Sequence, residues 1–312
     1  MIGFDIGGTK CAVCAGYERD GEIYVSDKRV IPTRHDVSPY EILDEMCRLA
    51  EEMTDDFSRI GISCGGPLDS AKGVIMSPPN LPGWDNVDVF GYLKPRYGGT
   101  VNLQNDANAC AVAEWKFGAG RGTKNMIFLT FGTGLGAGLV LNGALYTGAC
   151  DMAGEAGHIR LAKTGPVGYG KAGSFEGFCS GNGIAALGRS YAMDKLNKNQ
   201  AVSFCPSPGE LDKISAKSIA DAADEGFEDA KEIYRKSGEM LGYGLAVLID
   251  ILNPERIVIG SVFQRSEMLL RGAMEETLAR ECLSYSLEAC KIVPAALGDG
   301  LGDIAALSVA LL

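Results

Sequence analysis

The sequence predicts an α/β protein of two domains, each a mixed sheet flanked by helices. Its 312 residues are enough for two domains of ordinary size. Two stretches, Ile2–Ala15 and Leu129–Leu139, each read as a strand, a glycine-rich turn and a second strand, which indicates a duplicated architecture. The predicted order within residues 1–64 is β-β-β-α-β, which is typical of a sheet backed by helices.

The first glycine-rich turn carries groups suited to phosphate. Gly7 and Gly8 can adopt a positive φ without steric cost, and a turn without Cβ atoms lets backbone N–H groups approach an anion. Asp5 would repel phosphate directly, so we expect it to hold Mg²⁺ between them through water. Thr9 adds a hydroxyl and Lys10 a cation. The alternative is an ordinary hairpin with a lone acid.

The second turn, within Leu129–Leu139, repeats the pattern with Gly132, Thr133 and Gly134. It is neither a P-loop nor a dinucleotide fingerprint, because no Gly-Lys-Ser/Thr follows and the next residues read as a strand. Two such turns predict a polyphosphate held from two sides.

Together the stretches Asp5–Lys10 and Phe131–Gly138 resemble the two phosphate loops of the ROK family of sugar kinases and sugar-responsive repressors. This family belongs to the actin, hexokinase and heat-shock-ATPase superfamily, and the resemblance runs over nearly the full chain. It implies two actin-like (ribonuclease H-like) domains with a cleft between them for ATP and Mg²⁺. We expect the domains to span 1–105, completed by a C-terminal helix at 300–312, and 106–299.

Asparagine and aspartate open a helix predicted to run to about Phe117. Asn105 and Asp106 are preferred at helix N-termini, so capping alone could explain them. The Asn-Asp-Ala-Asn sequence also resembles the family's catalytic motif, which implies that Asp106 is the general base and binds the sugar. A carboxylate that takes the proton of a sugar hydroxyl accelerates transfer by about 10²–10⁴-fold. Asn105 and Asn108 would orient it.

Further sugar ligands follow from the resemblance. The loop 77–84 contains three prolines, which make it stiff. Its family counterpart contacts the sugar and implies that Asn80 binds a hydroxyl, although an asparagine could equally cap a turn. The Glu-x-Gly-His motif implies the same role for Glu155 and His158, and Glu176 matches another sugar-hydroxyl acceptor.

The chain departs from the family at its zinc loop. Three cysteines of the family pattern complete a tetrahedral site with the histidine. The corresponding positions hold Val167, Tyr169 and Ser174, and Cys179 lies five residues beyond the last of them. We therefore predict no structural zinc.

Apolar spacing predicts the remaining elements. Residues 39–53 form an amphipathic helix, with Ser38 as N-cap and Pro39 at its first position. Residues 227–252 form another, which contains Gly238, Gly242 and Gly244. Because each glycine weakens an isolated helix by about 0.8–1 kcal/mol relative to alanine, we expect another backbone or a ligand to approach closely there.

A buried strand at 256–259 runs into Gly260 and Ser261. In the superfamily this turn lies near the adenosine, which makes both residues candidate nucleotide contacts. A strand followed by a turn is also a common arrangement without any ligand.

Composition narrows the class of protein. The apolar fraction of 46% and charged fraction of 22% are those of a globular protein. A net charge of −11 argues against a nucleic-acid surface. No leader sequence or membrane-spanning run is recognisable, and the ten cysteines are scattered. We expect a cytoplasmic protein with no membrane partner.

The predicted function is phosphoryl transfer from Mg-ATP to a hexose hydroxyl, most often the 6-hydroxyl in this family. Glucose is the default substrate, with N-acetylmannosamine, N-acetylglucosamine, fructose and allose as alternatives. A catalytically weak sugar sensor is a second possibility, given the missing cysteines. Family repressors carry an N-terminal helix-turn-helix, for which we expect no room. Analogy with the family predicts a homodimer.

Overall fold

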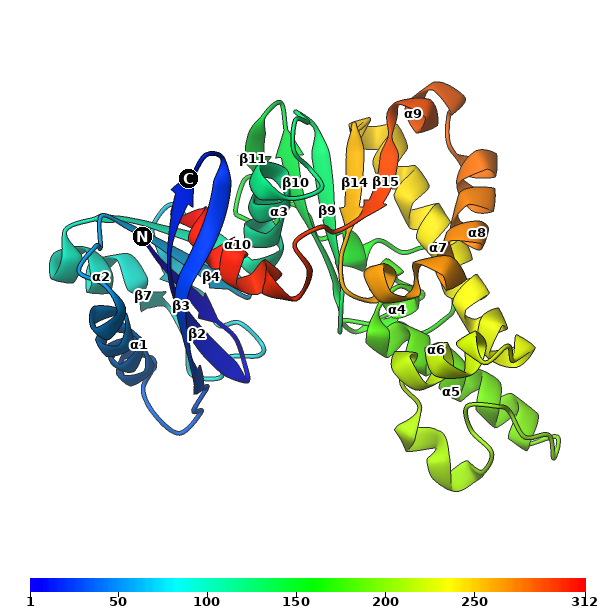
Figure 1. Ribbon diagram of the computed structural model, residues 1–312. Helices are drawn as coiled ribbons and strands as arrows, with labels where there is room; N and C mark the ends of the chain where they lie inside the picture. Colours follow the sequence, from blue (N-terminus) through cyan, green and yellow to red (C-terminus); the bar gives the residue numbers. More distant parts are fainter. The chain divides into compact units, whose positions relative to one another are not determined.

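The computed structural model describes residues 1–312 (Figure 1). Its first sheet has the strand order β3-β2-β1-β4-β8. The bounds are β1 Ile2–Ile6, β2 Lys10–Arg19, β3 Glu22–Pro32, β4 Arg59–Cys64 and β8 Thr100–Asn105. The first three strands pair antiparallel, whereas β4 runs parallel to β1 and β8 runs parallel to β4. The sheet is therefore mixed, as predicted.

Helices α1 (Pro39–Met53) and α2 (Val89–Tyr97) bury their apolar residues in the same core as alternate residues of β1, such as Ile2 and Phe4. The predicted start of α1 is confirmed. The Ser38 side chain accepts from the backbone of Tyr40, and Glu41 completes a capping box.

The opposite face of this sheet is lined by glycine where helix α10 (Leu301–Val309) crosses it. A Cβ at Gly3 would lie 2.8 Å from the Leu307 backbone nitrogen, and one at Gly61 would lie 2.2 Å from the Ala306 carbonyl oxygen. Helix α10 also packs on α3 (Asp106–Phe117) through alanines. The C-terminal helix thus completes this part of the fold.

A second sheet has the order β11-β10-β9-β14-β15. The bounds are β9 Met126–Phe131, β10 Leu135–Leu141, β11 Ala144–Tyr146, β14 Arg256–Ile259 and β15 Lys291–Pro294. Strands β10 and β11 pair antiparallel and β14 and β15 pair parallel, so this sheet is mixed too.

The remaining elements are mostly helices. They are α4 Phe175–Phe178, α5 Gly181–Leu196, α6 Ala216–Asp224, α7 Glu228–Leu252, α8 Val262–Glu281 and α9 Ser284–Ala289, with short strands β5 Leu68–Asp69, β6 Val74–Ile75, β7 Val87–Asp88, β12 Val167–Gly168 and β13 Lys171–Ala172, and 3-10 turns at Ala156–His158, Pro208–Lys213 and Gly298–Gly300.

The glycines of α7 lie where neighbours approach closely, as predicted. A Cβ at Gly238 would lie 2.4 Å from the Leu270 carbonyl oxygen of α8. A Cβ at Gly244 would lie 2.3 Å from the ring of Phe175 in α4. Their cost in helix propensity is offset by close packing of α7 against α8 and α4.

The chain divides into two compact units. Unit 1 comprises 1–128, 138–153 and 296–312, and unit 2 comprises 129–137 and 154–295. Helix α3 belongs to unit 1, together with the first sheet and with α10, which packs on both. We had predicted that the second domain begins at residue 106, the first residue of α3. The domain boundaries themselves stay a prediction.

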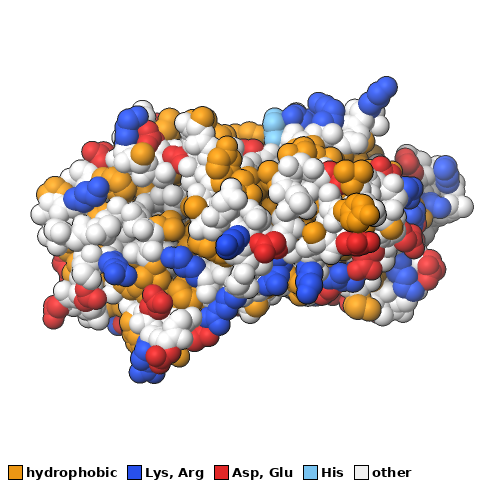
Figure 2. All heavy atoms as spheres, turned by 90° about the horizontal axis from the view of Figure 1, so that it is seen from above, with side chains coloured by type: hydrophobic (Ala, Val, Ile, Leu, Met, Phe, Trp, Pro, Cys, Tyr) orange, Lys and Arg blue, Asp and Glu red, His pale blue; other side chains and the backbone are white.

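Acidic, basic and apolar side chains are interspersed over the face that Figure 2 shows. None of the helices combines the length and apolar character needed to cross a bilayer.

Candidate active site

In unit 1 the predicted catalytic and sugar residues gather where three strands end. Strands β1, β4 and β8 are neighbours, and their register pairs Ile6 with Cys64 and Cys64 with Asn105. The carboxyl ends of these parallel strands therefore lie side by side, which is where α/β sheets bind ligands.

The first glycine turn joins β1 and β2 as a hairpin, as predicted, but neither Gly7 nor Gly8 has the positive φ that we expected to require glycine there. Gly7 N donates to Lys10 O at 3.1 Å. A Cβ at Gly8 would lie only 2.4 Å from the carbonyl oxygen of Asn80, so the turn and the sugar loop are in contact. The side chains of Thr9 and Lys10 are exposed and available to a ligand.

Asp5 lies on the face of β1 that faces the start of α10, since a Cβ at Gly302 would be 3.6 Å from its Oδ2. Burial, followed by the nearby Asp106 and Asp303, raises the pKa of Asp5 to about 6. Lys10 and Lys28 oppose this rise, and Lys28 also pairs with Asp303 at 2.7 Å. Carboxylate oxygens held near one another suit a hard divalent cation such as Mg²⁺. No group of three or more potential ligands is found here, and the expected coordination of Mg²⁺ by Asp5 through water stays a prediction.

Replacing Asp5 by Asn is expected to raise the free energy of unfolding by about 2 kcal/mol at pH 8. A carboxyl whose pKa is raised from 3.8 to about 6 destabilises the folded state when charged, and this cost disappears as the pH falls toward 3.8. The gain should therefore shrink between pH 8 and pH 4. Urea unfolding followed by tryptophan fluorescence measures it, because Trp84 and Trp115 both lie in unit 1.

The exposed Asp36, replaced by Asn, is the matched control and should change stability little at either pH. An Asp5→Asn gain of equal size at both pH values would contradict the assigned origin of the cost.

Asn105 caps helix α3, and its Oδ1 accepts from Ala107 N at 2.9 Å. Its amide nitrogen faces Gly66, where a Cβ would lie 3.2 Å away, and the Asn80 amide faces the adjoining Gly65 at 3.2 Å. The two predicted sugar ligands of unit 1 thus share one glycine turn. Capping uses only one of the Asn105 side-chain atoms, so it does not exclude a second role.

Asp106 is the first residue of α3, and its Oδ1 accepts from Ala107 N at 2.8 Å. Removal from water raises the pKa of Asp106, and the hydrogen bonds to backbone N–H groups oppose the rise. The Asp106 side chain is nonetheless exposed to solvent. A sugar hydroxyl can therefore reach the carboxylate, which a general base requires.

Asn108 does not orient Asp106, contrary to the prediction. Its Nδ2 donates to Gln104 Oε1 at 3.3 Å in the interior, and its Oδ1 is buried without a partner. Residues that lie two positions apart in a helix point to nearly opposite sides, so Asn108 faces the core while Asp106 is exposed.

In unit 2 the second predicted phosphate turn joins β9 and β10. Gly132 N donates to Gly134 O at 3.0 Å, and the Thr130 hydroxyl accepts from Gly136 N at 2.9 Å. Thr130 therefore closes the hairpin, whereas the Thr133 side chain is exposed.

The Glu176 side chain is hydrogen-bonded to the residue that follows this turn. Its Oε2 accepts from Leu135 N at 3.0 Å, and a Cβ at Gly134 would lie 2.6 Å from that oxygen. Gly157, between Glu155 and His158, is equally confined, because a Cβ would lie 2.1 Å from Leu135 O. The structure thus brings these sugar-ligand candidates beside the Gly132–Gly134 turn within unit 2.

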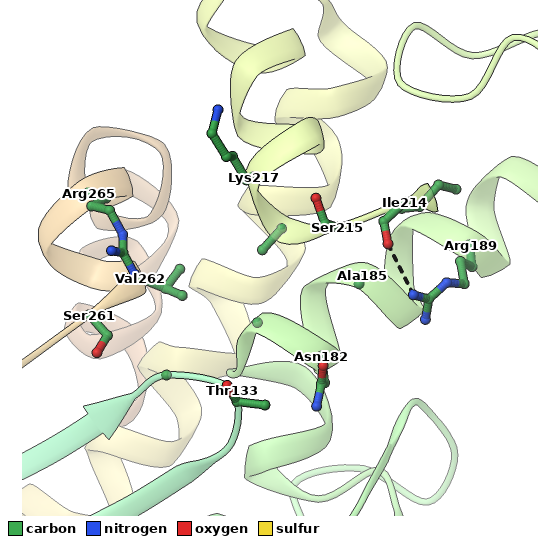
Figure 3. A pocket seen from close by; sticks show the side chains of 13 residues that line it. Thr133, Asn182, Ala185, Arg189, Ile214, Ser215, Lys217, Ser261, Val262 and Arg265 are labelled. Carbon is green, nitrogen blue, oxygen red and sulfur yellow. Dashed lines mark hydrogen bonds between the residues drawn. The ribbon is translucent and has the colours of Figure 1, made fainter. Parts of the chain in front are cut away.

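A pocket of about 480 Å³ opens beside Thr133 in the same unit (Figure 3). Its walls are Gly132, Thr133, Gly181, Asn182, Ala185, Arg189, Ile214, Ser215, Ala216, Lys217, Ser261, Val262 and Arg265. Ser261 is among these lining residues and Gly260 is not. The N–H of Gly260 donates to Leu129 O at 3.0 Å. The nucleotide contacts of both residues stay predictions.

The N-termini of three helices, α5, α6 and α8, meet at this pocket through Gly181, Ala216 and Val262. Helix N-termini present unpaired N–H groups and a partial positive charge, which favours an anionic ligand. Sequence reasoning missed the lining residues of α5 and α6. Ser180 and Ser215 are typical N-caps and mark both starts, but nothing local says that the starts converge.

The family model described as "ROK family" matches residues 1–311. A glucokinase of Thermotoga maritima is 32% identical over 315 aligned positions, covering 99% of this chain and 96% of the relative. An N-acetylmannosamine kinase of Escherichia coli (strain SMS-3-5) is 30% identical over 288 positions, covering 92% and 91%. The crystal structure of a ROK family glucokinase from Streptomyces griseus in complex with glucose and AMPPNP has a TM-score of 0.76 and 29% identity, covering 98% of this chain and 97% of that one.

These matches confirm the predicted class of actin-like α/β fold. Since both the family model and a relative above 30% identity extend over nearly all of the sequence, the chain belongs to the ROK family.

Proposed function

We propose that this ROK sugar kinase transfers the γ-phosphoryl group of Mg-ATP to a hexose hydroxyl, with glucose as the first candidate. The observation that carries the proposal is the accessible Asp106 carboxylate at the strand ends that also bear the Gly7–Thr9 turn and Asn80. The match to a glucokinase and to a glucose-bound structure supports glucose. The match to an N-acetylmannosamine kinase keeps N-acetylhexosamines as alternative substrates.

In this proposal the sugar is bound by acceptors that orient its hydroxyls. Asn80 and Asn105 contribute from unit 1, and Glu155, His158 and Glu176 contribute from unit 2. Asp106 takes the proton of the attacking hydroxyl. Several acceptors around one ring reject sugars with a hydroxyl in the wrong place, because a buried polar group would then lack its partner.

ATP is proposed to occupy the pocket of unit 2, with its phosphates on the Gly132–Gly134 turn. The convergent helix N-termini and the cation of Arg265 support an anionic ligand there, whereas the ammonium group of Lys217 is paired with Asp221 at 2.7 Å. In unit 1, Gly7, Gly8, Thr9 and Lys10 are proposed to contact the terminal phosphates. Mg²⁺, organised by Asp5 through water, neutralises charge on the phosphates.

The test is ADP release coupled to a spectrophotometric reaction, with Mg-ATP and a panel of glucose, N-acetylmannosamine, N-acetylglucosamine, fructose and allose. Turnover with one sugar well above the rate without sugar supports the proposal and names the substrate. Sugar binding by calorimetry without any turnover would contradict it and favour a sugar sensor.

Replacing Arg265 by Gln is expected to raise the KM for ATP about tenfold, because a cation at the pocket wall is lost. The KM for the sugar should change little. Arg280, near the far end of α8, gives the matched control Arg280→Gln. Equal KM values for ATP in wild type and Arg265→Gln would place the nucleotide elsewhere.

The homodimer, the cytoplasmic location and the absence of nucleic-acid and membrane partners stay predictions.

A further inference from the structure

The loop that precedes Glu176 does not fit the zinc ion of the family pattern. Val167 and Tyr169 are 64% and 76% exposed and offer no thiolate, imidazole or carboxylate. Ser174 is buried, and its hydroxyl accepts from Gly177 N at 3.1 Å, which caps α4. Cys179 is buried and its Sγ donates to Ser237 O. No group of three or more potential ligands is found anywhere in residues 1–312.

A β-hairpin with a two-residue turn occupies this position instead. Strand β12 pairs antiparallel with β13, Val167 opposite Ala172. Tyr169 and Gly170 form the turn with φ of 43° and 74°. Two positive φ values are those of a type I′ turn, whose twist matches a hairpin. A tyrosine in this conformation is unusual, and such residues persist where the surroundings hold them.

Side chains of this hairpin reach the turn that bears His158. Lys171 Nζ donates to the carbonyl oxygen of His158 at 2.7 Å. The ring of Tyr169 meets the His158 ring edge-on, with centroids 6.3 Å apart. Arg160 donates in the other direction, to Ala172 O at 2.7 Å. The two segments are therefore tied from both sides.

Backbone hydrogen bonds continue the connection to Glu176. Phe175 N donates to Ile159 O at 2.8 Å, and Leu161 N donates to Gly173 O at 2.9 Å. The segment after His158 and the segment before Glu176 are thus held together by backbone hydrogen bonds. A metal ion bound by the histidine and the loop would make the same connection.

We propose that Lys171 is a positioning residue that replaces the metal: it ties the His158 turn to the β12–β13 hairpin, so that the sugar-binding loop is ordered without zinc. This inference depends on the proposed function only in assuming that the loop binds a sugar. The ammonium group supplies a charge-assisted hydrogen bond where the family's cysteine pattern would supply a metal bond. Lys171 does not contact the reacting atoms.

Three variants test this role. Lys171→Met removes the donor and keeps the length of the side chain, Lys171→Arg keeps a donor, and Lys163→Met removes an exposed lysine of the same loop that has no hydrogen bond or ion pair. With glucose as the probe, Lys171→Met should raise the sugar KM about five- to tenfold, with kcat and the KM for ATP nearly unchanged. Lys171→Arg should restore most of the affinity, and Lys163→Met should match wild type.

Hydrogen exchange provides a readout that needs no sugar. Lys171→Met should accelerate amide exchange in the segments 159–162 and 173–176, whereas Lys163→Met should not. Protein incubated with ZnCl₂ and passed through a desalting column should retain no stoichiometric zinc, and 1,10-phenanthroline should leave exchange unchanged.

Exchange in Lys171→Met equal to wild type would overturn the proposal. So would one retained zinc per chain whose removal loosens the loop. Absence of turnover with any sugar would instead count against the proposed function, while the exchange comparison would still decide the role of Lys171.

Discussion

Replacing Asp106 by Asn is expected to lower kcat by about 10²–10⁴-fold, with a much smaller change in the KM for the sugar. The asparagine keeps an oxygen that can accept from Ala107 N, so the start of α3 is preserved. It cannot take a proton at neutral pH, and the hydroxyl then attacks without a base. Initial rates in the coupled ADP-release assay measure the effect.

Asp36→Asn is the control, because this exposed aspartate lies in the same unit and should leave kcat unchanged.

Since the pKa of Asp106 is raised above 3.8 and that of Asp5 to about 6, wild-type activity should fall as the pH drops through about 6. Wild-type kcat in Asp106→Asn would mean that this residue only begins a helix.

Replacing Gly61 by Ala is expected to lower the free energy of unfolding by about 3 kcal/mol. The added Cβ would lie 2.2 Å from Ala306 O and 2.4 Å from Ala310 N. Both are backbone atoms of the C-terminal segment, so no side-chain rotation can relieve the overlap. Helix α10 must shift away from β4, and the packing of the first sheet is lost with it.

Gly300→Ala makes the same chemical change at an open position of unit 1, where the Cβ would be 3.9 Å from Ile304 and φ is −81°. It should change stability by less than about 0.5 kcal/mol. Urea unfolding followed by tryptophan fluorescence compares the two. Equal midpoints would contradict the close packing of α10 on the glycine face.

Local chemistry explains the predictions that the structure confirms. Ser38 begins α1 because its hydroxyl satisfies a free N–H, and that depends only on the neighbouring residues. The glycine turns at residues 7–8 and 132–134 need glycine for close approach, because a Cβ at Gly8 would lie 2.4 Å from Asn80 O and one at Gly134 would lie 2.6 Å from Glu176 Oε2. None of these glycines has a positive φ, so the expected conformational reason does not apply to them. Their outcome as phosphate contacts remains to be measured by the variants above.

Other features depended on contacts between distant residues. Helices α8 and α9 were not predicted, because buried and exposed residues follow no simple stripe along α8. The Asn-Asp-Ala-Asn motif predicted that Asn108 orients Asp106, but the Asn108 side chain donates to Gln104 in the core instead.

The sequence by itself determined the two glycine turns, the helix caps and the loss of zinc ligands, since each follows from the chemistry of a few adjacent residues. The tertiary structure alone decided that α5, α6 and α8 begin around one pocket. It alone decided that Lys171 reaches the carbonyl of His158, thirteen residues earlier in the chain. Which donor meets which acceptor across such separations is set by how the whole chain packs, and no local preference encodes it.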